Sequence, residues 1–469
     1  PEDVVGVVLA SPPDMVGLFE KPEYQLNHKE LLVEAKRNIK EGNPRKLVSG
    51  VVWDWCQLSS QTYADLSEKG GAVDNLPVMR NPEEFVELAS IDVPILGIMA
   101  HAKLQGTLFD FAKKVSPLFS VVYCSLIYAI AIALPSPRTA SVTHEMAIQP
   151  FWDSSSLLTS LIYFMLVFVF AINRSKVLDL LGKLLTPGIL IILLIMIATA
   201  VFTLDFNFMP SEMVQPFSSG ILEGYQTFDA IGAVVVGAVI IISINIKEKS
   251  ASFEEKRRLI GRAGLWAGIG LFLVYGGLIL TGSLFGEFFD SEISRTALLR
   301  GISTKTLGQT ANMLLSILVS LACFTTAVGI VTGTSDFIKG RFGNSIFAYR
   351  ITAFLGCLLG VLVGQFDVGY IINVAVPSLM FIYPITIVLI LLNVVPDKWG
   401  SPKVFKHVVW TTILFSIPDF LGSIGLGESI SPYVKWIPLS QHQMGWVLPA
   451  LIAFIISNLS NSAEILSTN

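Results

Sequence analysis

The stretch Gly220–Asp229, which reads GILEGYQTFD, opens an apolar segment and decides how that segment folds. It contains two carboxylates, Glu223 and Asp229, together with two glycines, a tyrosine and a threonine. Such residues favour a broken helix, whose free backbone groups are tolerated at membrane depth only beside a cavity or within protein. The ends of broken helices bind cations and substrate carboxylates in transporters. The alternative is that both carboxylates lie at the outer membrane interface.

The composition of the whole chain supports a membrane location for this segment. The chain has 469 residues, of which 52% are hydrophobic and 14% are charged, whereas soluble domains average about 25% charged residues. The mean hydropathy is +0.65. These values exclude a disordered chain and an ordinary soluble enzyme over the full length. The net charge of −4 leaves no basic surface for a nucleic-acid partner.

The charges divide the chain into two parts. Residues 1–100 carry 9 basic and 16 acidic residues, and residues 101–469 carry 23 basic and 20 acidic residues. We therefore predict a small soluble α/β fragment over residues 1–93 and an all-α polytopic membrane domain over residues 94–469. Within the first part, residues 90–99 read as a short strand.

The membrane domain contains repeated apolar stretches, and about 20 mostly apolar residues suffice to cross about 30 Å of hydrocarbon. We predict ten spans, preceded by a stub, Val93–Ala102, of half the required length. The spans lie near residues 117–134, 157–172, 184–203, 221–244, 264–284, 312–332, 347–364, 368–394, 405–422 and 444–458.

The loops test this count independently. When loops are assigned alternately to two sides, one side carries 18 Lys and Arg residues and the other carries 5. The positive-inside rule places the first side in the cytoplasm. We therefore expect a multi-pass protein of the inner (plasma) membrane, with the lipid bilayer as its surroundings.

The side chains of the spans do not favour catalysis. None of the five histidines lies at metal-ligand spacing from another, and no Cys/His pattern suggests zinc. We expect no enzyme activity and no cofactor. A secondary transporter, a channel or a non-functional folded remnant remain as classes.

The hydroxyl pair Thr325 and Thr326 lies among small residues within the span 312–332. Two adjacent hydroxyls can offer oxygen ligands to a hard cation such as sodium. Helix packing through small residues, or a threonine bonding its own backbone, explains the pair equally well.

Two prolines, Pro377 and Pro384, interrupt the span 368–394. Proline frees backbone carbonyls and kinks a helix, which predicts either a gate or a static kink. Arg138 is the sole basic residue of its outer loop. It is a candidate outer-gate partner, or an interfacial arginine that snorkels.

Several of these runs together resemble the branched-chain amino acid permeases, a family of cation-coupled carriers for leucine, isoleucine and valine. The resemblance covers about residues 94–460. It rests on the second-to-third helix region, an outer loop and the sixth, eighth and tenth helices, which correspond to residues 94–100 and 111–119, 137–145, 220–229, 322–329 and 370–384.

The resemblance implies a fold of twelve helices with a five-plus-five inverted repeat, whose broken helices hold the substrate. It places substrate contacts on Gly224, Tyr225 and Thr227, with Tyr123 or Tyr128 lining the cavity. It places sodium on Thr325 and Thr326. From the residues alone, Glu223 and Asp229 are further candidates for cation coupling, including by protons.

The family's Gly-rich first helix, with a Gly-Ala-Gly-Asn pattern, does not occur in this sequence. We therefore expect a permease domain without its first helix and most of its second. Residues 1–93 resemble a fragment of an α/β-hydrolase domain, yet no Gly-x-Ser-x-Gly nucleophile elbow occurs. The predicted function is sodium-coupled transport of branched-chain amino acids by alternating access. The alternative is a gene fusion that is inactive, or a membrane-tethered hydrolase-like protein.

Overall fold

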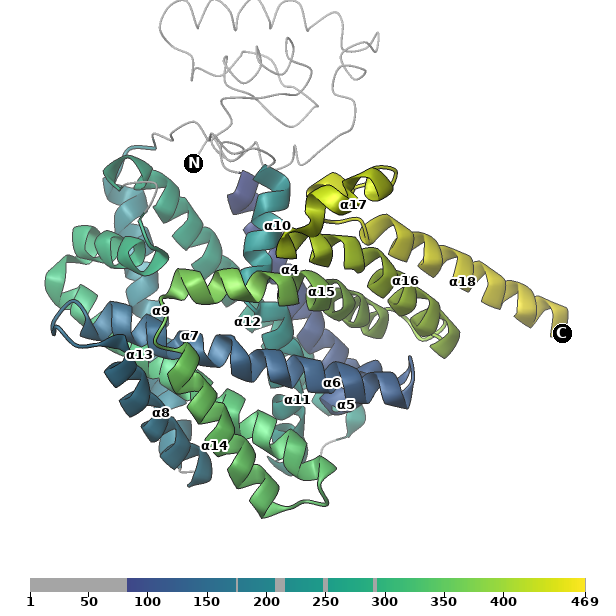
Figure 1. The fold of residues 1–469 in the computed structure, drawn as a ribbon, viewed down its shortest axis with the longest axis horizontal. Coiled ribbons are helices and arrows are strands. Elements are labelled where there is room, and N and C mark those ends of the chain that lie inside the picture. Colours follow the sequence, from purple (N-terminus) through teal and green to yellow (C-terminus); the bar gives the residue numbers. More distant parts are fainter. Residues whose placement is uncertain (1–81, 174–175, 207–215, 248–251, 290–292, 469) are drawn as a thin grey trace, which may run out of the picture. The chain divides into compact units, whose positions relative to one another are not determined.

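The computed structural model describes residues 82–173, 176–206, 216–247, 252–289 and 293–468. Within these ranges every regular element is a helix and no strand occurs. Residues 86–205 and 218–469 form one compact body, shown in Figure 1. The predicted α/β fragment, residues 1–93, lies almost entirely outside the described residues.

Each of the ten predicted spans corresponds to helix. Seven described helical stretches are long and apolar enough to cross a membrane, and shorter apolar helices account for residues 93–104, 156–172 and 447–460. Nine spans map to α6 (Pro117–Ala133), α8 (Ser156–Ile172), α9 (Lys176–Thr203), α12 (Phe253–Leu284), α13 (Arg295–Arg341), α14 (Ile346–Val363), α15 (Val368–Val394), α16 (Pro402–Leu421) and α18 (Val447–Thr468).

The remaining predicted span, residues 221–244, is the fourth along the chain. It is divided as the sequence predicts. It forms α10 (Pro216–Gln226) and α11 (Asp229–Lys247), with Thr227 and Phe228 between them. The broken helix is therefore confirmed in the structure.

The strand predicted over residues 90–99 is wrong, because these residues belong to α4 (Pro82–Leu104). A short apolar run fits a strand or a helix by pattern alone, and its packing partners decide. Ile95 and Ile98 occupy the space that a Cβ atom would take at Gly268 and Gly264 of α12. The glycines let α4 pack closely as a helix.

Two stretches that read as outer loops are also helical. Residues 135–148 form α7 (Pro135–Thr143) and a π-helix (His144–Ile148), and α13 begins at Arg295. Non-helical backbone at Gly308, with φ 82°, separates the first part of α13 from its predicted span. These short helices supply Arg138 and Arg295, which contact the end of α10.

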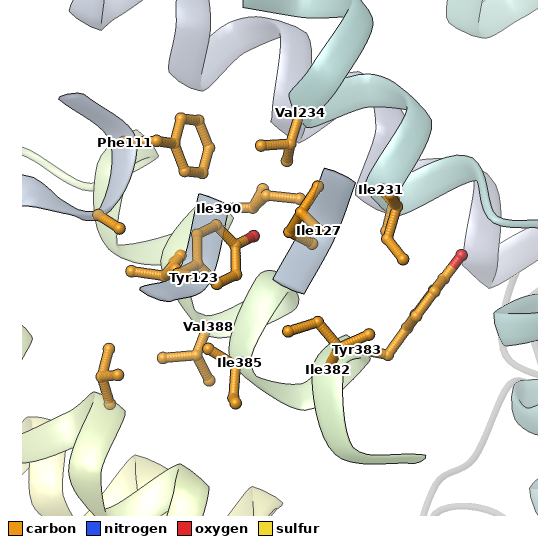
Figure 2. Packing of buried hydrophobic residues seen from close by; sticks show 14 of the residues in the cluster. Phe111, Tyr123, Ile127, Ile231, Val234, Ile382, Tyr383, Ile385, Val388 and Ile390 are labelled. Atoms are coloured by element: carbon orange, nitrogen blue, oxygen red, sulfur yellow. The ribbon is translucent and has the colours of Figure 1, made fainter. Parts of the chain in front are cut away.

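The apolar core gathers around α15. This helix packs against α16, α11 and α5 (Leu108–Lys113), and α16 packs in turn against α18. Figure 2 shows side chains of α15, among them Ile382 and Ile385, close to Tyr123 and Ile127 of α6 and Ile231 of α11. The break between α10 and α11 lies beside this core, since Tyr225 and Phe228 belong to the same buried cluster.

Candidate transport site at a broken helix

The break is a two-residue interruption with defined backbone partners. Phe228 has φ 63°, a left-handed conformation that is uncommon for a bulky residue. The Thr227 hydroxyl donates to the Gly224 carbonyl at 2.8 Å and accepts from the Asp229 amide at 3.3 Å. The Thr227 side chain therefore bonds to both the end of α10 and the start of α11.

Two arginines, from α7 and α13, bond to residues at the carboxyl end of α10. Arg138 of α7 donates to the Gln226 carbonyl at 2.9 Å. Arg295 of α13 pairs with Glu223 at 2.7 Å and also donates to the Gln226 side chain at 2.9 Å. Positive charge at the carboxyl end of a helix complements the helix dipole.

Arg295 also lines a cavity of about 600 Å³. The wall of the cavity is braced by Glu145 on the π-helix. Its carboxylate accepts from the Val368 amide at 2.9 Å and from the Thr296 hydroxyl. Glu145 therefore joins the start of α15 to the start of α13.

Aromatic side chains also lie at the break. The rings of Tyr225 and Tyr383 lie 4.6 Å apart, and both side chains are buried. Asp229, the first residue of α11, accepts from the Tyr275 hydroxyl of α12 at 2.7 Å. An acidic residue in the first turn of α11 also complements the helix dipole.

The structure brings some of the predicted site residues together. Glu223, Gly224, Tyr225, Thr227 and Asp229 lie on the two sides of the break. Glu223 is half-buried and in an ion pair with an arginine.

The other predicted residues lie elsewhere in the body. The Tyr123 hydroxyl is 3.0 Å from that of Thr386 on α15, and Tyr128 stacks on Phe337 with ring centroids 4.7 Å apart. Thr325 and Thr326 both donate to the Ala322 carbonyl of α13, at 2.9 Å each.

Pro377 and Pro384 lie inside a continuous α15. This helix has the largest buried share among the described candidate spans, 61%.

Sequence reasoning missed two residues at the break, Arg295 and Tyr275. Arg295 is one of the few basic residues of its outer loop, and Tyr275 is a polar side chain within an apolar span. Both features are visible in the sequence. Their partners are 72 and 46 residues away, as the residue numbers show.

In the described part of the chain, long apolar helices pack with a helix that is broken between α10 and α11, and this arrangement defines a multi-pass membrane transport protein. The family model described as "Branched-chain amino acid transport protein" matches residues 84–464, and the chain belongs to this family. The protein is therefore a transporter and not an enzyme.

Two relatives illustrate the family. The branched-chain amino acid transport system 2 carrier protein of Pseudomonas aeruginosa is 30% identical, covering 79% of this chain and 86% of that protein. The branched-chain amino acid permease BrnQ of Escherichia coli K12 is 28% identical, covering 79% and 85%.

A solved structure supports the same fold class. The inward-facing conformation of Mhp1 covers 82% of this chain and 84% of its own with a TM-score of 0.51. At 12% identity this similarity concerns the fold alone.

Proposed function

We propose that the chain carries leucine, isoleucine and valine across the inner membrane by alternating access, coupled to sodium. The observation that carries this proposal is the break between α10 and α11, whose two ends face each other across Thr227. Family membership supports the substrate class, and both relatives described above are named for branched-chain amino acids.

The two helix ends suit the two charges of an amino acid. The carboxyl end of α10, at Gly224 and Tyr225, carries partial negative charge and would face the substrate ammonium. The amino end of α11 would face the substrate carboxylate. The buried rings of Tyr225 and Tyr383 would bound the apolar side chain. Tyr123 lies further along the same cluster and would line the pocket from α6.

For the coupling ion we propose Thr325 and Thr326. Each hydroxyl proton already points at the Ala322 carbonyl, so the oxygen lone pairs are available to a hard cation. Glu223 and Asp229 would add negative charge from the broken helix. Because Glu223 is paired with Arg295, its contribution would change as that pair opens.

For the gates we propose the arginines on the outer side and the prolines within α15. Arg138 and Arg295 bond to residues at the end of α10, and in this proposal these contacts close the outer gate. Release of these contacts would open the break to the cavity lined by Arg295. Pro377 and Pro384 each leave a carbonyl without its helical partner, which lets α15 bend without breaking.

The test is uptake of labelled leucine into vesicles that contain the full chain. We expect uptake that requires an inward sodium gradient and is inhibited by isoleucine and valine but not by lysine. Thr325→Ala should abolish sodium dependence. Ser320→Ala is the matched control, because Ser320 bonds its own helix one turn earlier, at the Ser316 carbonyl. Equal uptake with potassium in place of sodium would contradict sodium coupling.

A second form of the chain addresses residues 1–93, which we propose to be a hydrolase-like fragment ahead of the permease domain. In this form, the first helix of the Pseudomonas carrier is joined ahead of residue 84, where the family match begins. Uptake only in this form would mean that a first helix is required for transport. Uptake in neither form would contradict the proposed function.

A further inference from the structure

A buried carboxylate near the break has one oxygen atom without a hydrogen-bond partner among the described residues. Asp419 is in the last turn of α16 and only 6% of its surface is exposed. Its Oδ2 atom has no hydrogen-bond partner among the described residues. Carboxylates at membrane depth are costly and are a hypothesis of function by default.

The helix around Asp419 is distorted. Pro418 precedes it, a π-helix (Gly422–Leu426) follows it, and Gly425 within that π-helix has φ 87°. π-helical turns are rare and occur frequently at functional sites. The distortion is independent of the buried carboxylate and occurs within the same turn and a half of chain.

Asp419 lies near Tyr225, at the carboxyl end of α10. Its charge acts on Tyr225 of α10, and its carboxylate lies beside the Gly445 amide. Trp446 lies next to Tyr225 as well. The Trp446 indole nitrogen and the Tyr383 hydroxyl are also buried and without hydrogen-bond partners among the described residues. Buried polar side chains from α15, α16 and the residue just before α18 thus gather near Tyr225.

The other titratable groups on the elements around Asp419 do not neutralise it. Tyr225 and Tyr383 are neutral side chains in their ordinary state. Lys435, on the segment between α17 (Gly427–Val434) and α18, is exposed and forms no ion pair with Asp419 in the described part of the chain. His442 lies on the same segment and is partly exposed. Arg138 and Arg295 bond to Gln226, the residue after Tyr225, and neither forms an ion pair with Asp419 among the described residues.

An ionised carboxylate sealed without a cation is strongly unfavourable, and such a group takes up a proton instead. A proton, unlike a larger ligand, can bind to a buried carboxylate without a cavity beside it. We propose that Asp419 is a proton-binding site of the transporter, which holds a proton while the break is sealed and releases it to water when the break opens. This inference rests on the proposed function only for the opening step.

The release would couple protons to substrate. The O–H bond of the carboxylic acid breaks and the proton passes to water that enters the opened pathway. Asp419 then carries its charge beside Tyr225, where the substrate ammonium is proposed to bind. Substrate binding should therefore release a proton and strengthen as the pH rises.

Infrared spectroscopy of the purified full chain tests proton binding without any substrate. We expect the C=O stretch of a protonated carboxylic acid at neutral pH, lost in Asp419→Asn and retained in Asp153→Asn, an exposed carboxylate of an outer loop. If Asp419→Asn folds poorly, Asp419→Glu provides a second test. It keeps a carboxylic acid at this position and should still show the acid band. Asp229→Asn identifies any signal of the half-buried Asp229 carboxylate. The same spectrum in wild type and Asp419→Asn would overturn the proposal.

The pH dependence of leucine binding tests the coupling. One released proton changes the dissociation constant up to about tenfold per pH unit. We expect tighter leucine binding at higher pH in wild type and a flat profile in Asp419→Asn. Equal slopes in both would overturn the coupling while leaving the proposed function intact. If neither protein bound leucine, the proposed function would fail, and the infrared result would still decide whether Asp419 holds a proton.

Discussion

Two transmembrane segments with helix-breaking residues behave in opposite ways. Residues 216–247 contain no proline after Pro216, yet the helix breaks at Thr227 and Phe228. α15 contains Pro377 and Pro384 and runs as one helix from Val368 to Val394.

The difference lies in what each segment offers its free backbone groups. At the break, Thr227 and Arg138 bond the carbonyls of Gly224 and Gln226, so the interruption leaves these groups satisfied. In α15, the prolines free only the carbonyls of Asn373 and Met380, and tight packing on several helices holds the axis. A helix in a membrane breaks where polar partners replace its lost hydrogen bonds.

The largest effect should follow from removal of Arg138, one of the two arginines that bond to the end of α10. In Arg138→Gln, the carbonyl of Gln226 loses a charged donor, and such a hydrogen bond is worth about 1.5–3 kcal/mol. We expect leucine uptake to fall by roughly ten- to a hundredfold. Initial rates of uptake measure this.

Arg300→Gln is the matched control for this variant. Arg300 lines the cavity together with Arg295, yet within the described ranges no bond links its side chain to α10. If both variants lost uptake equally, general loss of positive charge would explain the effect and the specific cap on α10 would be ruled out.

A smaller loss should follow from removal of the hydroxyl that joins the two half-helices. Thr227→Val keeps the shape but removes the bonds to Gly224 and Asp229, at a cost of about 1 kcal/mol for a capping side chain. We expect leucine affinity to fall about fivefold, measured by binding to the purified protein. Thr227→Ser retains the hydroxyl and should bind nearly as wild type, and equal losses in the two variants would argue against the capping role.

Restoration of the hydrogen bonds in α15 should have a weaker effect. Pro377→Ala and Pro384→Ala return an amide to the Asn373 and Met380 carbonyls, a gain of about 0.5–1.5 kcal/mol each that stiffens the helix. We expect uptake to slow about threefold with unchanged leucine affinity, since bending is affected and binding is not. Val374→Ala, at an exposed position of the same helix, should change neither. Unchanged rates in the proline variants would mean that the kinks are static.

The comparison also explains what the sequence could predict. The break was predictable because its cause is local: glycines and polar side chains follow one another within ten residues. The ten spans were predictable because hydropathy and loop charge depend on composition. The ion pair of Arg295 with Glu223 was not, since 72 residues separate the two in the chain.

For residues 90–99, the local sequence pattern was not enough to predict the correct element. Their apolar pattern suits a strand or a helix, and the helix is selected by Gly264 and Gly268, far away in α12. In the sequence, Asp419 is a single carboxylate within the predicted span 405–422. Its placement beside Tyr225 depends on how α16 packs near the break.

The smallest expected effect concerns the carboxyl end of α15, where an exposed ion pair joins Asp397 to Lys103. Asp397 follows this helix, and the hydrogen bond and charge of Lys103, at 3.0 Å, lower the pKa of its carboxyl below the usual value, with Lys114 adding to the effect. Because the folded-state pKa is lowered, the contribution to stability is present at neutral pH and is lost as the pH falls through that pKa. The Asp397 side chain is 79% exposed, so Asp397→Asn should cost no more than about 0.5 kcal/mol. Thermal unfolding in detergent should show a slightly lower midpoint for the variant at neutral pH and the same midpoint as wild type in acid. A difference that persisted in acid would mean that Asp397 acts through packing and not through its charge.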